Sequence, residues 1–382
     1  MTQARNVLVY GASGYTGKLV AESLAQRKMP FYMAGRTLDR LQNALAVVEE
    51  RHGQKVDAEL VIVNHNLGEL VELLQRLEIK VLINNVGPFM QLGWPVVEAC
   101  LEAGVHYLDT TGEQDWTAAI GDKYGAAFAA KKLLLCPANS FMWAAGALAA
   151  EVVLETPGID SLDICYQIDN GLPSEASTKS FLRMVCNDVS QYYLEQNQLK
   201  AWPNDVAYKV FVPYRNAQLS AHPWGGACEP IWFKDDPRVL NCKVLTAMGE
   251  HLIDPVMQAI RAFNELAPGM TQEQREALTN QMGAQMDQGE PPKDDLDVQR
   301  GVIVVHGQGR QITSTYVMNL SAAYTWTGDI CAEGAERLLS GKLKNVGFQS
   351  PAMAFGHREL IDRFHERGFC SALPARCQGD AQ

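Results

Sequence analysis

A glycine-rich turn between a short apolar stretch and a helical segment constrains the fold more than any other feature of the sequence. Residues 7–10 (VLVY) predict a buried strand, and GASGYTG follows at residues 11–17, directly before a predicted helix. A strand, a glycine-rich turn and a helix in this order are typical of dinucleotide-binding βαβ units. Gly11 permits the tight turn, Gly14 lets a pyrophosphate approach the backbone, and Gly17 permits close packing of the helix.

The start of the helix after this turn predicts a phosphate site, because its free N–H groups and partial positive charge attract anions. Ser13, Tyr15 and Thr16 complete the predicted cofactor contacts of the loop. A nucleotide-triphosphate P-loop is excluded, since Leu19 stands where that motif places Ser or Thr and the spacing of the glycines differs. A glycine-rich turn without a ligand remains the alternative.

The first third of the chain alternates strands and helices at short intervals. The predicted strands are continuously apolar and amphipathic helices separate them, which indicates a parallel sheet covered on both faces. Right-handed crossovers then predict an α/β fold with a Rossmann-type doubly wound sheet. The expected elements are strands at 7–10, 31–35, 60–64, 81–85 and 106–109, and helices at 17–27, 38–50, 67–77 and 95–104.

The uncharged run 133–150 is long enough to span a bilayer. It contains the break Pro-Ala-Asn-Ser at 137–140, however, and a spanning helix rarely carries such a polar interruption. We therefore expect a buried strand at 133–136, a turn, and a buried helix at 141–153.

The pattern changes after residue 155, where strands, helices and long loops mix and predict a second, α+β domain. We expect a cofactor domain at 1–140, a substrate or oligomerisation domain at 141–350, and a helical segment at 351–382 that can return to the first domain. The expected elements are a strand at 161–169, helices at 178–197, 252–266, 271–286 (with Thr271 and Gln274 as a capping box), 330–340 and 356–367, and a hairpin at 302–324 that turns at 307–310.

The end of the second predicted strand bears on the choice of cofactor. A site for NAD usually places an acid here to hold the ribose hydroxyls, whereas this chain has Arg36 followed by Thr37. A guanidinium suits the 2′-phosphate of NADP. We therefore predict NADP (NADPH) as the cofactor, with a surface arginine that caps the next helix as the alternative.

The charge balance argues against polyanionic partners. The 382 residues include 33 Lys and Arg against 44 Asp and Glu, a formal net charge of −11. An acidic chain is repelled by nucleic acid and by anionic membranes, so we expect neither as a partner.

The nine cysteines include no C-x-x-C pair, which favours reduced thiols, a cytoplasmic location and no metal site. We also expect that the second domain can carry a homodimer contact.

A longer run carries a family resemblance. Residues 84–113 read NNVGPFMQLGWPVVEACLEAGVHYLDTTGE. Together with GASGYTG and the Ala-Gly-Arg at 34–36, this run resembles the saccharopine dehydrogenase-like family in its VGP-F segment, its G-x-P-V-V-E-A-C helix and its H-Y-x-D-x-T-G-E strand. The resemblance covers residues 6–113, with a weaker echo near the end of the chain. It implies a Rossmann domain, a nicotinamide cofactor and hydride transfer to or from a small-molecule substrate.

One segment departs from part of that family, which includes NADP-dependent reductases of imine adducts and trans-acting enoyl reductases. The enoyl reductases carry Gly-Phe-Asp-Ser-x-Pro-Ser after the fifth strand, whereas residues 137–142 here read Pro-Ala-Asn-Ser-Phe-Met. We therefore predict an NADP-dependent oxidoreductase that transfers hydride to a C=N or C=O bond. Reduction of the C=C bond of a thioester, and a non-catalytic dinucleotide-binding sensor or scaffold, remain the alternatives.

The end of the fourth strand adds candidate cofactor contacts that do not depend on the resemblance. Val86, Gly87 and Pro88 follow this strand, and ligands of open parallel sheets lie beyond the carboxyl ends of the strands. A glycine at this place allows the backbone to approach the cofactor.

Polar residues at two other places have two interpretations each. Tyr107, Asp109 and Glu113 could supply a proton near the nicotinamide, but acids are expected in a first helical turn in any case, so we favour helix capping for the acids and a core position for the tyrosine. The segment 173–179, with Arg183 one turn on, is either an anion-binding helix start or an N-cap followed by solvated basic residues, and we favour the latter.

Motifs of several other enzyme classes are absent from the sequence. No Tyr is followed by Lys four residues on, as in short-chain dehydrogenases, and the chain has no G-x-S-x-G or H-E-x-x-H. Because a nicotinamide carries the chemistry itself, a hydride-transfer enzyme needs no obvious catalytic motif. The sequence therefore predicts no particular catalytic residue.

Overall fold

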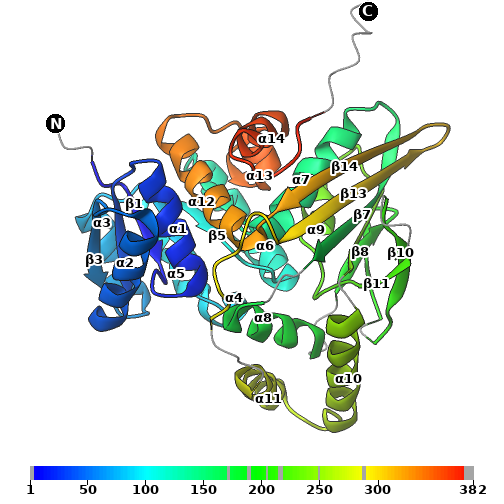
Figure 1. Ribbon diagram of the computed structural model, residues 1–382, viewed down its shortest axis with the longest axis horizontal. Helices are drawn as coiled ribbons and strands as arrows, with labels where there is room; N and C mark the ends of the chain where they lie inside the picture. The colour runs from blue at the N-terminus through cyan, green and yellow to red at the C-terminus, as the bar shows by residue number, and fades with distance from the viewer. Residues whose placement is uncertain are drawn as a thin grey trace, which may run out of the picture.

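The computed structural model describes residues 4–169, 173–186, 191–203, 205–213, 218–247, 250–285 and 290–373. Within these residues the chain forms two sheets with helices around each (Figure 1). The first six strands of the first sheet and the helices between them are blue and cyan in Figure 1, and most of the second sheet is green to yellow. The first sheet carries the glycine-rich turn, and the second belongs to the part of the chain that faces it.

The described part of the first sheet contains seven strands, all parallel, in the order β15-β6-β5-β4-β1-β2-β3. This order confirms the predicted doubly wound α/β fold, because the chain moves outward from β1 first in one direction and then in the other. Sequence analysis missed the edge strand β15. The strands are β1 (Val7–Tyr10), β2 (Phe31–Gly35), β3 (Ala58–Ile62), β4 (Val81–Asn84), β5 (His106–Asp109), β6 (Leu134–Cys136) and β15 (Gly347–Phe348).

Alternating side chains bury both faces of this sheet, which is why its strands are continuously apolar. Val7 and Val9 of β1 belong to one hydrophobic cluster, and Leu8 and Tyr10 belong to another. The first cluster includes residues of α1 and α2, and the second includes residues of α3, α5 and α6. The helices are α1 (Tyr15–Gln26), α2 (Leu38–His52), α3 (Leu67–Arg76), α4 (Phe89–Leu92), α5 (Trp94–Ala103) and α6 (Gln114–Ala130).

The second sheet is mixed, as the predicted α+β pattern requires. Its main path runs β10-β11-β12-β7-β13-β14, with β7 and β12 parallel and the other neighbours antiparallel, and β8 joins β9 to β12. The strands are β7 (Ile159–Asp169), β8 (Tyr192–Glu195), β9 (Gln198–Ala201), β10 (Tyr208–Phe211), β11 (Gln218–His222), β12 (Asn241–Ala247), β13 (Arg300–Gly309) and β14 (Thr313–Ser321). The helices are α7 (Phe141–Leu154), α8 (Glu175–Cys186), α9 (Glu229–Phe233), α10 (Glu250–Leu266) and α11 (Gln272–Gln285).

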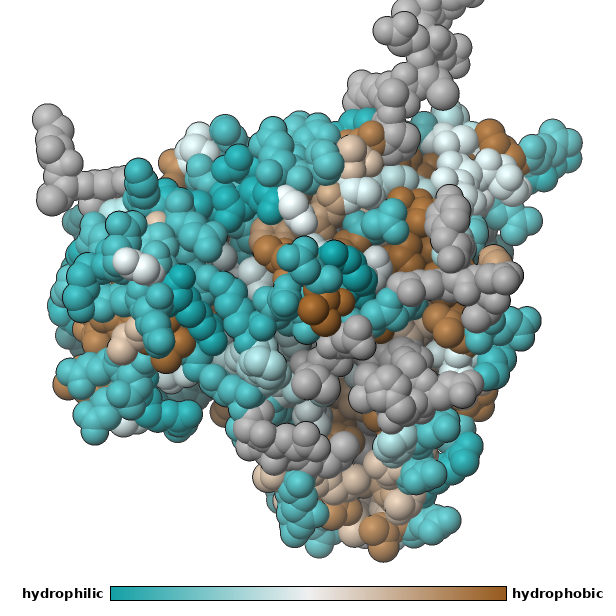
Figure 2. Space-filling view, viewed as in Figure 1, coloured by the Kyte–Doolittle hydropathy of each residue, from teal (hydrophilic) through white to brown (hydrophobic). Residues whose placement is uncertain are grey.

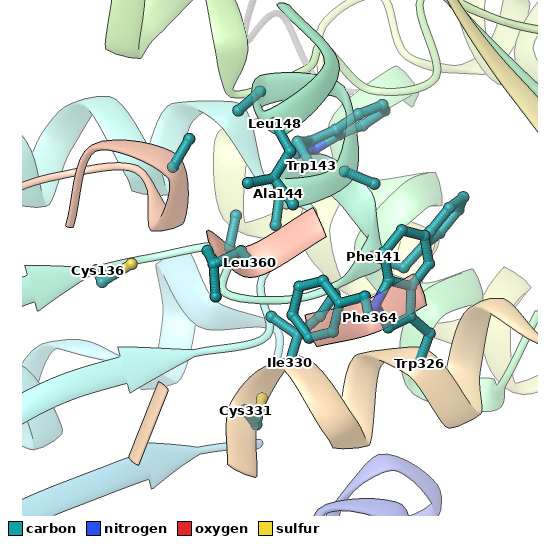
Figure 3. Packing of buried hydrophobic residues seen from close by; sticks show 14 of the residues in the cluster. Cys136, Phe141, Trp143, Ala144, Leu148, Trp326, Ile330, Cys331, Leu360 and Phe364 are labelled. Carbon is teal, nitrogen blue, oxygen red and sulfur yellow. The ribbon is translucent and has the colours of Figure 1, made fainter. Parts of the chain in front are cut away.

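The last helices lie where the two sheets meet. The first of them, α12, packs along α1, and Figure 3 shows its Trp326 and Ile330 close to Phe141 of α7 and Phe364 of α14. This single hydrophobic cluster reaches from β1 to β14, so the two sheets share a core. The helices are α12 (Ala323–Leu339), α13 (Pro351–Phe355) and α14 (His357–Glu366).

The helix predicted at 178–197 is wrong in its second half. The helix ends at Cys186, and residues from Tyr192 onward form the β8–β9 hairpin. Gln196 and Asn197 at its turn have φ of 50° and 59°. A two-residue hairpin turn of this kind requires positive φ at both positions, so turn geometry overrides the helical pattern. Residues 187–190 of that prediction lie outside the described residues.

Smaller differences concern where elements begin and end. The β13–β14 hairpin turns at 310–311 rather than at 307–310, because Gln308 still pairs with Thr313 and the backbone N–H of Gly309 donates to the carbonyl oxygen of Ile312 (2.8 Å). Helix α12 begins at Ala323, earlier than the predicted 330. The predicted capping box of α11 is confirmed. The backbone N–H of Gln274 donates to Thr271 Oγ1 (3.3 Å), and the backbone N–H of Thr271 donates to the side-chain Oε1 of Gln274 (2.9 Å).

The uncharged run 133–150 forms β6, a turn and most of α7, as predicted. No helix in the described part of the chain has the length and the apolar character needed to cross a membrane. The division into domains at residues 140 and 350 stays a prediction, and β15 lies before the second of these boundaries although it extends the first sheet.

Candidate functional site

The glycine-rich turn leaves open space in front of the first turn of α1. Gly11 has φ of +76°, and a Cβ there would lie 2.8 Å from Val86 Cγ2. A Cβ on Gly17 would lie 2.5 Å from the carbonyl oxygen of Gly11, so this position requires glycine for close packing. At the exposed Gly14, by contrast, the nearest atom to a Cβ would be 3.5 Å away. The turn therefore offers the backbone of Gly14 and the start of α1 to a ligand.

The other predicted residues of this loop differ in their surroundings. Thr16 lines a cavity, and Ser13 is half-buried. Tyr15 is buried, and its hydroxyl donates to the carbonyl oxygen of Pro292 (3.0 Å). Lys18, which sequence analysis did not use, pairs with Glu290 at 2.5 Å.

Residues 290–294 of the second part of the chain, which we call the strap, lie across the start of α1. Besides the contacts of Tyr15 and Lys18, Lys293 pairs with Glu22 of α1. The carboxylate of Asp294 accepts hydrogen bonds from the backbone N–H groups of Tyr324 (2.7 Å) and Thr325 at the start of α12. Sequence analysis did not predict these contacts, because the partners of the strap on α1 are about 270 residues away in the chain.

Arg36 is exposed directly after β2, and Thr37 is the N-cap residue of α2 without a side-chain cap hydrogen bond. Sequence analysis missed a neighbour, His65, which follows β3. Its Nδ1 lies 2.8 Å from the hydroxyl oxygen of Tyr10, and the two rings are stacked. Burial lowers the pKa of His65, and the charge of Arg36 lowers it further. Three polar side chains thus gather at the carboxyl ends of β1, β2 and β3.

Val86, Gly87 and Pro88 form the connection from β4 to α4. The amide of Val86 donates to Asn84 Oδ1 (3.0 Å), which fixes the chain as it leaves the strand. Gly87 and Phe89 line the same cavity as Thr16. The structure therefore brings the glycine-rich turn and the β4 connection to one place, as the prediction requires.

A cavity of about 590 Å³ lies beyond the carboxyl ends of the first sheet's strands. One side is formed by connections that follow β1, β4, β5 and β6, and the other side by α8, α10, the strap and the start of α12. Figure 2 shows a mainly hydrophilic surface over the first sheet, and more hydrophobic residues over α10. The residues from the first side include Thr16, Asn85, Gly87, Thr110, Gly112 and Ser140.

Tyr107 and Asp109 belong to a buried network rather than to the cavity wall. The Tyr107 hydroxyl and Trp116 Nε1 both donate to Asp109 Oδ2 at 2.8 Å. Asp109 Oδ1 accepts from the amides of Thr111 and Ala138, so the carboxylate joins the ends of β5 and β6. Burial raises the pKa of Asp109 to about 6, against the effect of these hydrogen bonds. Tyr107 is a core residue as predicted, whereas helix capping by Asp109 is wrong.

Glu113 precedes α6 but its side chain serves other elements, so the predicted cap is wrong here too. Its carboxylate accepts from the amides of Phe89 (2.8 Å) and Met90 (3.0 Å) at the start of α4, and from the Ser180 hydroxyl (2.8 Å). It also pairs with Arg183 at 2.7 Å. Glu113 thereby ties the β4 connection to α8 of the facing part of the chain.

The start of α8 has the predicted N-cap, since the amide of Ser177 donates to Ser174 Oγ (3.3 Å). The Tyr324 hydroxyl joins this cap: it accepts from the Ser174 amide and donates to Ser177 Oγ, both at 2.8 Å. The predicted solvation of Arg183 is wrong. Its side chain is 1% exposed and pairs with Asp115 (2.7 Å) as well as Glu113, partners that lie far away in the sequence.

Two family models match separate parts of the chain. Residues 7–130 match the saccharopine dehydrogenase NADP binding domain, and residues 144–374 match a family of unknown function, DUF5938. The first match covers the turn, Arg36 and the β4 connection. The second covers α8, α10, the strap and α12.

Curated relatives each match about a third of the chain. A lipid droplet localized protein of Caenorhabditis elegans is 34% identical over 123 residues, 31% of this chain and 29% of that protein. A saccharopine dehydrogenase-like oxidoreductase of Mus musculus is 28% identical over 146 residues, 36% and 34% of the two chains. A trans-acting enoyl reductase of Mycobacterium leprae is 31% identical over 140 residues, 35% and 32% of the two chains. The matched region thus spans about a third of each relative's length.

The whole chain has a counterpart among solved structures. The saccharopine dehydrogenase (L-Glu forming) of Saccharomyces cerevisiae matches with a TM-score of 0.60 at 12% identity, over 96% of this chain and 98% of that one. At this identity the likeness shows the fold. The chain therefore belongs to the DUF5938 family, and its residues 7–130 form a saccharopine dehydrogenase NADP binding domain.

Proposed function

We propose that the protein is an NADPH-dependent oxidoreductase that transfers hydride to a C=N or C=O bond of a small-molecule substrate. One observation carries the proposal: a single cavity has the connections of an NADP-binding sheet on one side and a second structural unit on the other. A dinucleotide site that opens into a further pocket fits an enzyme better than a sensor, which needs no room for a second molecule.

The residues at the sheet's carboxyl ends fit NADP. The open space at Gly14 and the start of α1 suits a pyrophosphate, and the exposed guanidinium of Arg36 suits a 2′-phosphate. When bound, the nicotinamide would supply the hydride. The cofactor contacts that we propose are Gly11, Ser13, Gly14, Tyr15, Thr16, Gly17, Arg36, Thr37, Val86, Gly87 and Pro88.

The protein's own groups have two roles: they hold the backbone beside the proposed cofactor site, and they exclude water from the cavity. Glu113 fixes the amides of Phe89 and Met90, and with them the connection beside the proposed nicotinamide position. Phe141 and Trp143, both nearly fully buried, form part of the cavity wall. We assign no catalytic acid or base.

A second candidate is reduction of a C=C bond. It is supported by the identity to the trans-acting enoyl reductase of Mycobacterium leprae. The Pro-Ala-Asn-Ser-Phe-Met segment at 137–142, which departs from the segment of the enoyl reductases, favours C=N or C=O.

We also propose a cytoplasmic location and a homodimer. All cysteines with described side chains are free thiols, which supports a reducing compartment. The edge strand β10 presents Phe211 with 64% exposure, which supports a contact with a second copy. Light scattering of the purified protein measures its mass and tests the homodimer.

The test of the proposed function has two stages. Fluorescence titration should show saturable NADPH binding by the purified protein. NADPH oxidation is then followed at the nicotinamide absorbance with ketones, with mixtures of oxo acids and amines, and with enoyl thioesters. Turnover of ketones or imines supports the proposal, and turnover of the thioesters alone would replace it by the second candidate. NADPH binding without any turnover would favour the sensor.

A further inference from the structure

The wall of the cavity that faces the NADP-binding sheet tells which class of molecule fits there, if the proposed function holds. This wall comes from α8, α10, the strap and the start of α12. A volume of about 590 Å³ lies within the range of pockets that enclose drug-sized molecules. The chemistry of the wall, more than its size, limits the substrate.

Aromatic and aliphatic side chains form much of this wall. The rings of Phe181 and Trp224 are stacked with their centroids 4.0 Å apart. Val256 and Ala259 of α10 lie on the same wall, and the cavity extends to Phe89 on the side of the first sheet. A molecule that fills this space exchanges water for apolar carbon on two sides.

The charged groups of the lining each already have a partner, which for Glu175 is Lys179. Among the described residues that line the cavity, the acids are Glu175, Glu290 and Asp294, and the one cation is Arg300. Glu290 pairs with Lys18, and Asp294 accepts two backbone N–H groups. The side chain of Arg300 is 50% exposed and donates to the carbonyl oxygen of Leu296.

The buried Arg183 is not available to a substrate either, because Glu113 and Asp115 hold it behind the wall. A dicarboxylate or an amino-acid adduct would therefore lose its hydration in this cavity, and the described lining would offer it three acids and one cation that all have partners already. An uncharged molecule meets neither penalty.

A cluster of hydroxyl groups interrupts the apolar side chains of the wall. The hydroxyls of Ser174, Ser177 and Tyr324 form a hydrogen-bonded cluster at the start of α8. Hydroxyl groups can both donate and accept, so this cluster suits one neutral polar group such as a carbonyl or imine.

We propose that the substrate is an uncharged molecule with an apolar body, whose main polar group is the C=O or C=N bond that is reduced. The apolar body lies against Phe181 and Trp224, and the polar group lies toward the hydroxyl cluster and the β4 connection. In the reduction, a hydride with its electron pair passes from NADPH to the carbon, the π bond opens, and a proton from water completes the O–H or N–H group, leaving NADP⁺. This inference rests on the proposed function and gives it a substrate class.

A displacement experiment tests this inference without requiring turnover. The neutral apolar fluorophore N-phenyl-1-naphthylamine serves as the probe. It is displaced by 2-undecanone or by 10-oxoundecanoate, a matched ketone in which a carboxylate replaces the terminal methyl group. We expect saturable probe binding, and displacement by 2-undecanone at about 30-fold lower concentration, because the described lining offers the carboxylate no cation without a partner. Absence of saturable binding, or equal displacement by the two ketones, would overturn the inference.

Two variants of α10 sharpen the result. Ala259→Lys adds a cation to the cavity wall and should reverse the preference toward 10-oxoundecanoate. Ala262→Lys places the same charge on an exposed position of the same helix and should leave the preference unchanged. If both variants behave alike, the probe binds elsewhere and the inference fails.

The two proposals fail in different ways. If the ketone displaces the probe but NADPH does not bind in a separate titration, the cavity assignment holds and the oxidoreductase proposal fails. If NADPH is oxidised with oxo acids and amines while 2-undecanone does not displace the probe, the oxidoreductase proposal holds and the substrate class is wrong.

Discussion

Arg36 is the residue on which the choice between NADPH and NADH depends. Its exposed guanidinium lies beyond β2, close enough to His65 and Tyr10 to affect the pKa of both. A hydrogen bond to a charged group contributes about 1.5–3 kcal/mol, which corresponds to roughly ten- to a hundredfold in affinity.

We predict that Arg36→Ala weakens NADPH binding by about 10- to 100-fold and NADH binding much less, since only NADPH has the 2′-phosphate. Fluorescence titration with both nucleotides at two salt concentrations measures this, and the preference of the parent should shrink at high salt. Arg310→Ala, on an exposed turn, is the control. An unchanged ratio of the two dissociation constants would place the 2′-phosphate elsewhere.

Glu229 of α9 makes stability depend on pH. Burial raises its pKa to about 8, against the effect of the hydrogen bond from the Tyr166 hydroxyl (2.7 Å). Between the ordinary pKa of 4.5 and about 8, the folded protein therefore keeps a proton that the unfolded chain releases. The free energy of unfolding falls as the pH rises through this window.

Glu229→Gln should remove this pH dependence, because the amide keeps an oxygen acceptor for Tyr166 and does not ionise. Relative to the variant, the parent should lose about 2–3 kcal/mol of unfolding free energy from pH 5.5 to 7.5, at about 1.4 kcal/mol per pH unit. Urea unfolding at both pH values measures the difference. Glu265→Gln, at an exposed position of α10, should change nothing. Parallel pH profiles of Glu229→Gln and parent would contradict the assignment.

At the scale of elements, α1 combines an anion-binding start with an acid placed beside it. Glu290 of the strap pairs with Lys18 in the first turn of α1 and lines the same cavity as Thr16. A pyrophosphate at this helix start would be repelled by the carboxylate, and the pairing reduces what Lys18 can offer it.

We therefore predict that Glu290→Gln tightens NADPH binding by about 3- to 10-fold at low salt, with a smaller gain at high salt. Glu22→Gln removes the acid that holds Lys293 farther along α1 and should have a smaller effect. Titration of both variants with NADPH at two ionic strengths gives the comparison. Weaker NADPH binding by Glu290→Gln would contradict this prediction and would mean that the ion pair between the strap and Lys18 is needed for the cofactor to bind.

The elements that sequence analysis predicted best are those whose formation is decided locally. The strands of the first sheet are apolar on both faces, and residues of β1 alternate between two hydrophobic clusters. The strand β1 can therefore be predicted from its own residues, without knowledge of the strands that pair with it. The two-residue strand β15 carries no periodicity, and its place depends on pairing with β6. The β8–β9 hairpin depends on the backbone at Gln196 and Asn197, which a helical pattern of side chains does not report.

At the scale of the whole molecule, Glu113 and Arg183 join the NADP-binding sheet to the part that faces it. Both side chains are at most 1% exposed. The sequence identifies Glu113 as a residue before a helix and Arg183 as a basic residue on a helix, but their pairing joins positions 70 residues apart. The cofactor loops could be predicted because they follow strands in the sequence, whereas the facing wall could not, because folding brings its parts together from α8 to α12.

Arg183→Met should lower the free energy of unfolding by about 3–5 kcal/mol, because Glu113 and Asp115 then stay buried without their cation. Lys55→Met removes an exposed ion pair and should change it by less than about 1 kcal/mol. Urea unfolding of both variants checks this. Arg183→Met combined with Glu113→Gln and Asp115→Asn should recover part of the loss, and no recovery would show that packing rather than charge is responsible.

The return of α12 and β15 to the first sheet has a consequence for synthesis on the ribosome. The glycine-rich turn and six strands of that sheet emerge first, but the helix along α1 and the seventh strand are translated some two hundred residues later. Until then, part of the apolar surface of α1 lacks its cover, and the edge of β6 stays open to other strands. The nascent NADP-binding part of the chain therefore stays partly uncovered until α12 and β15 have been synthesised.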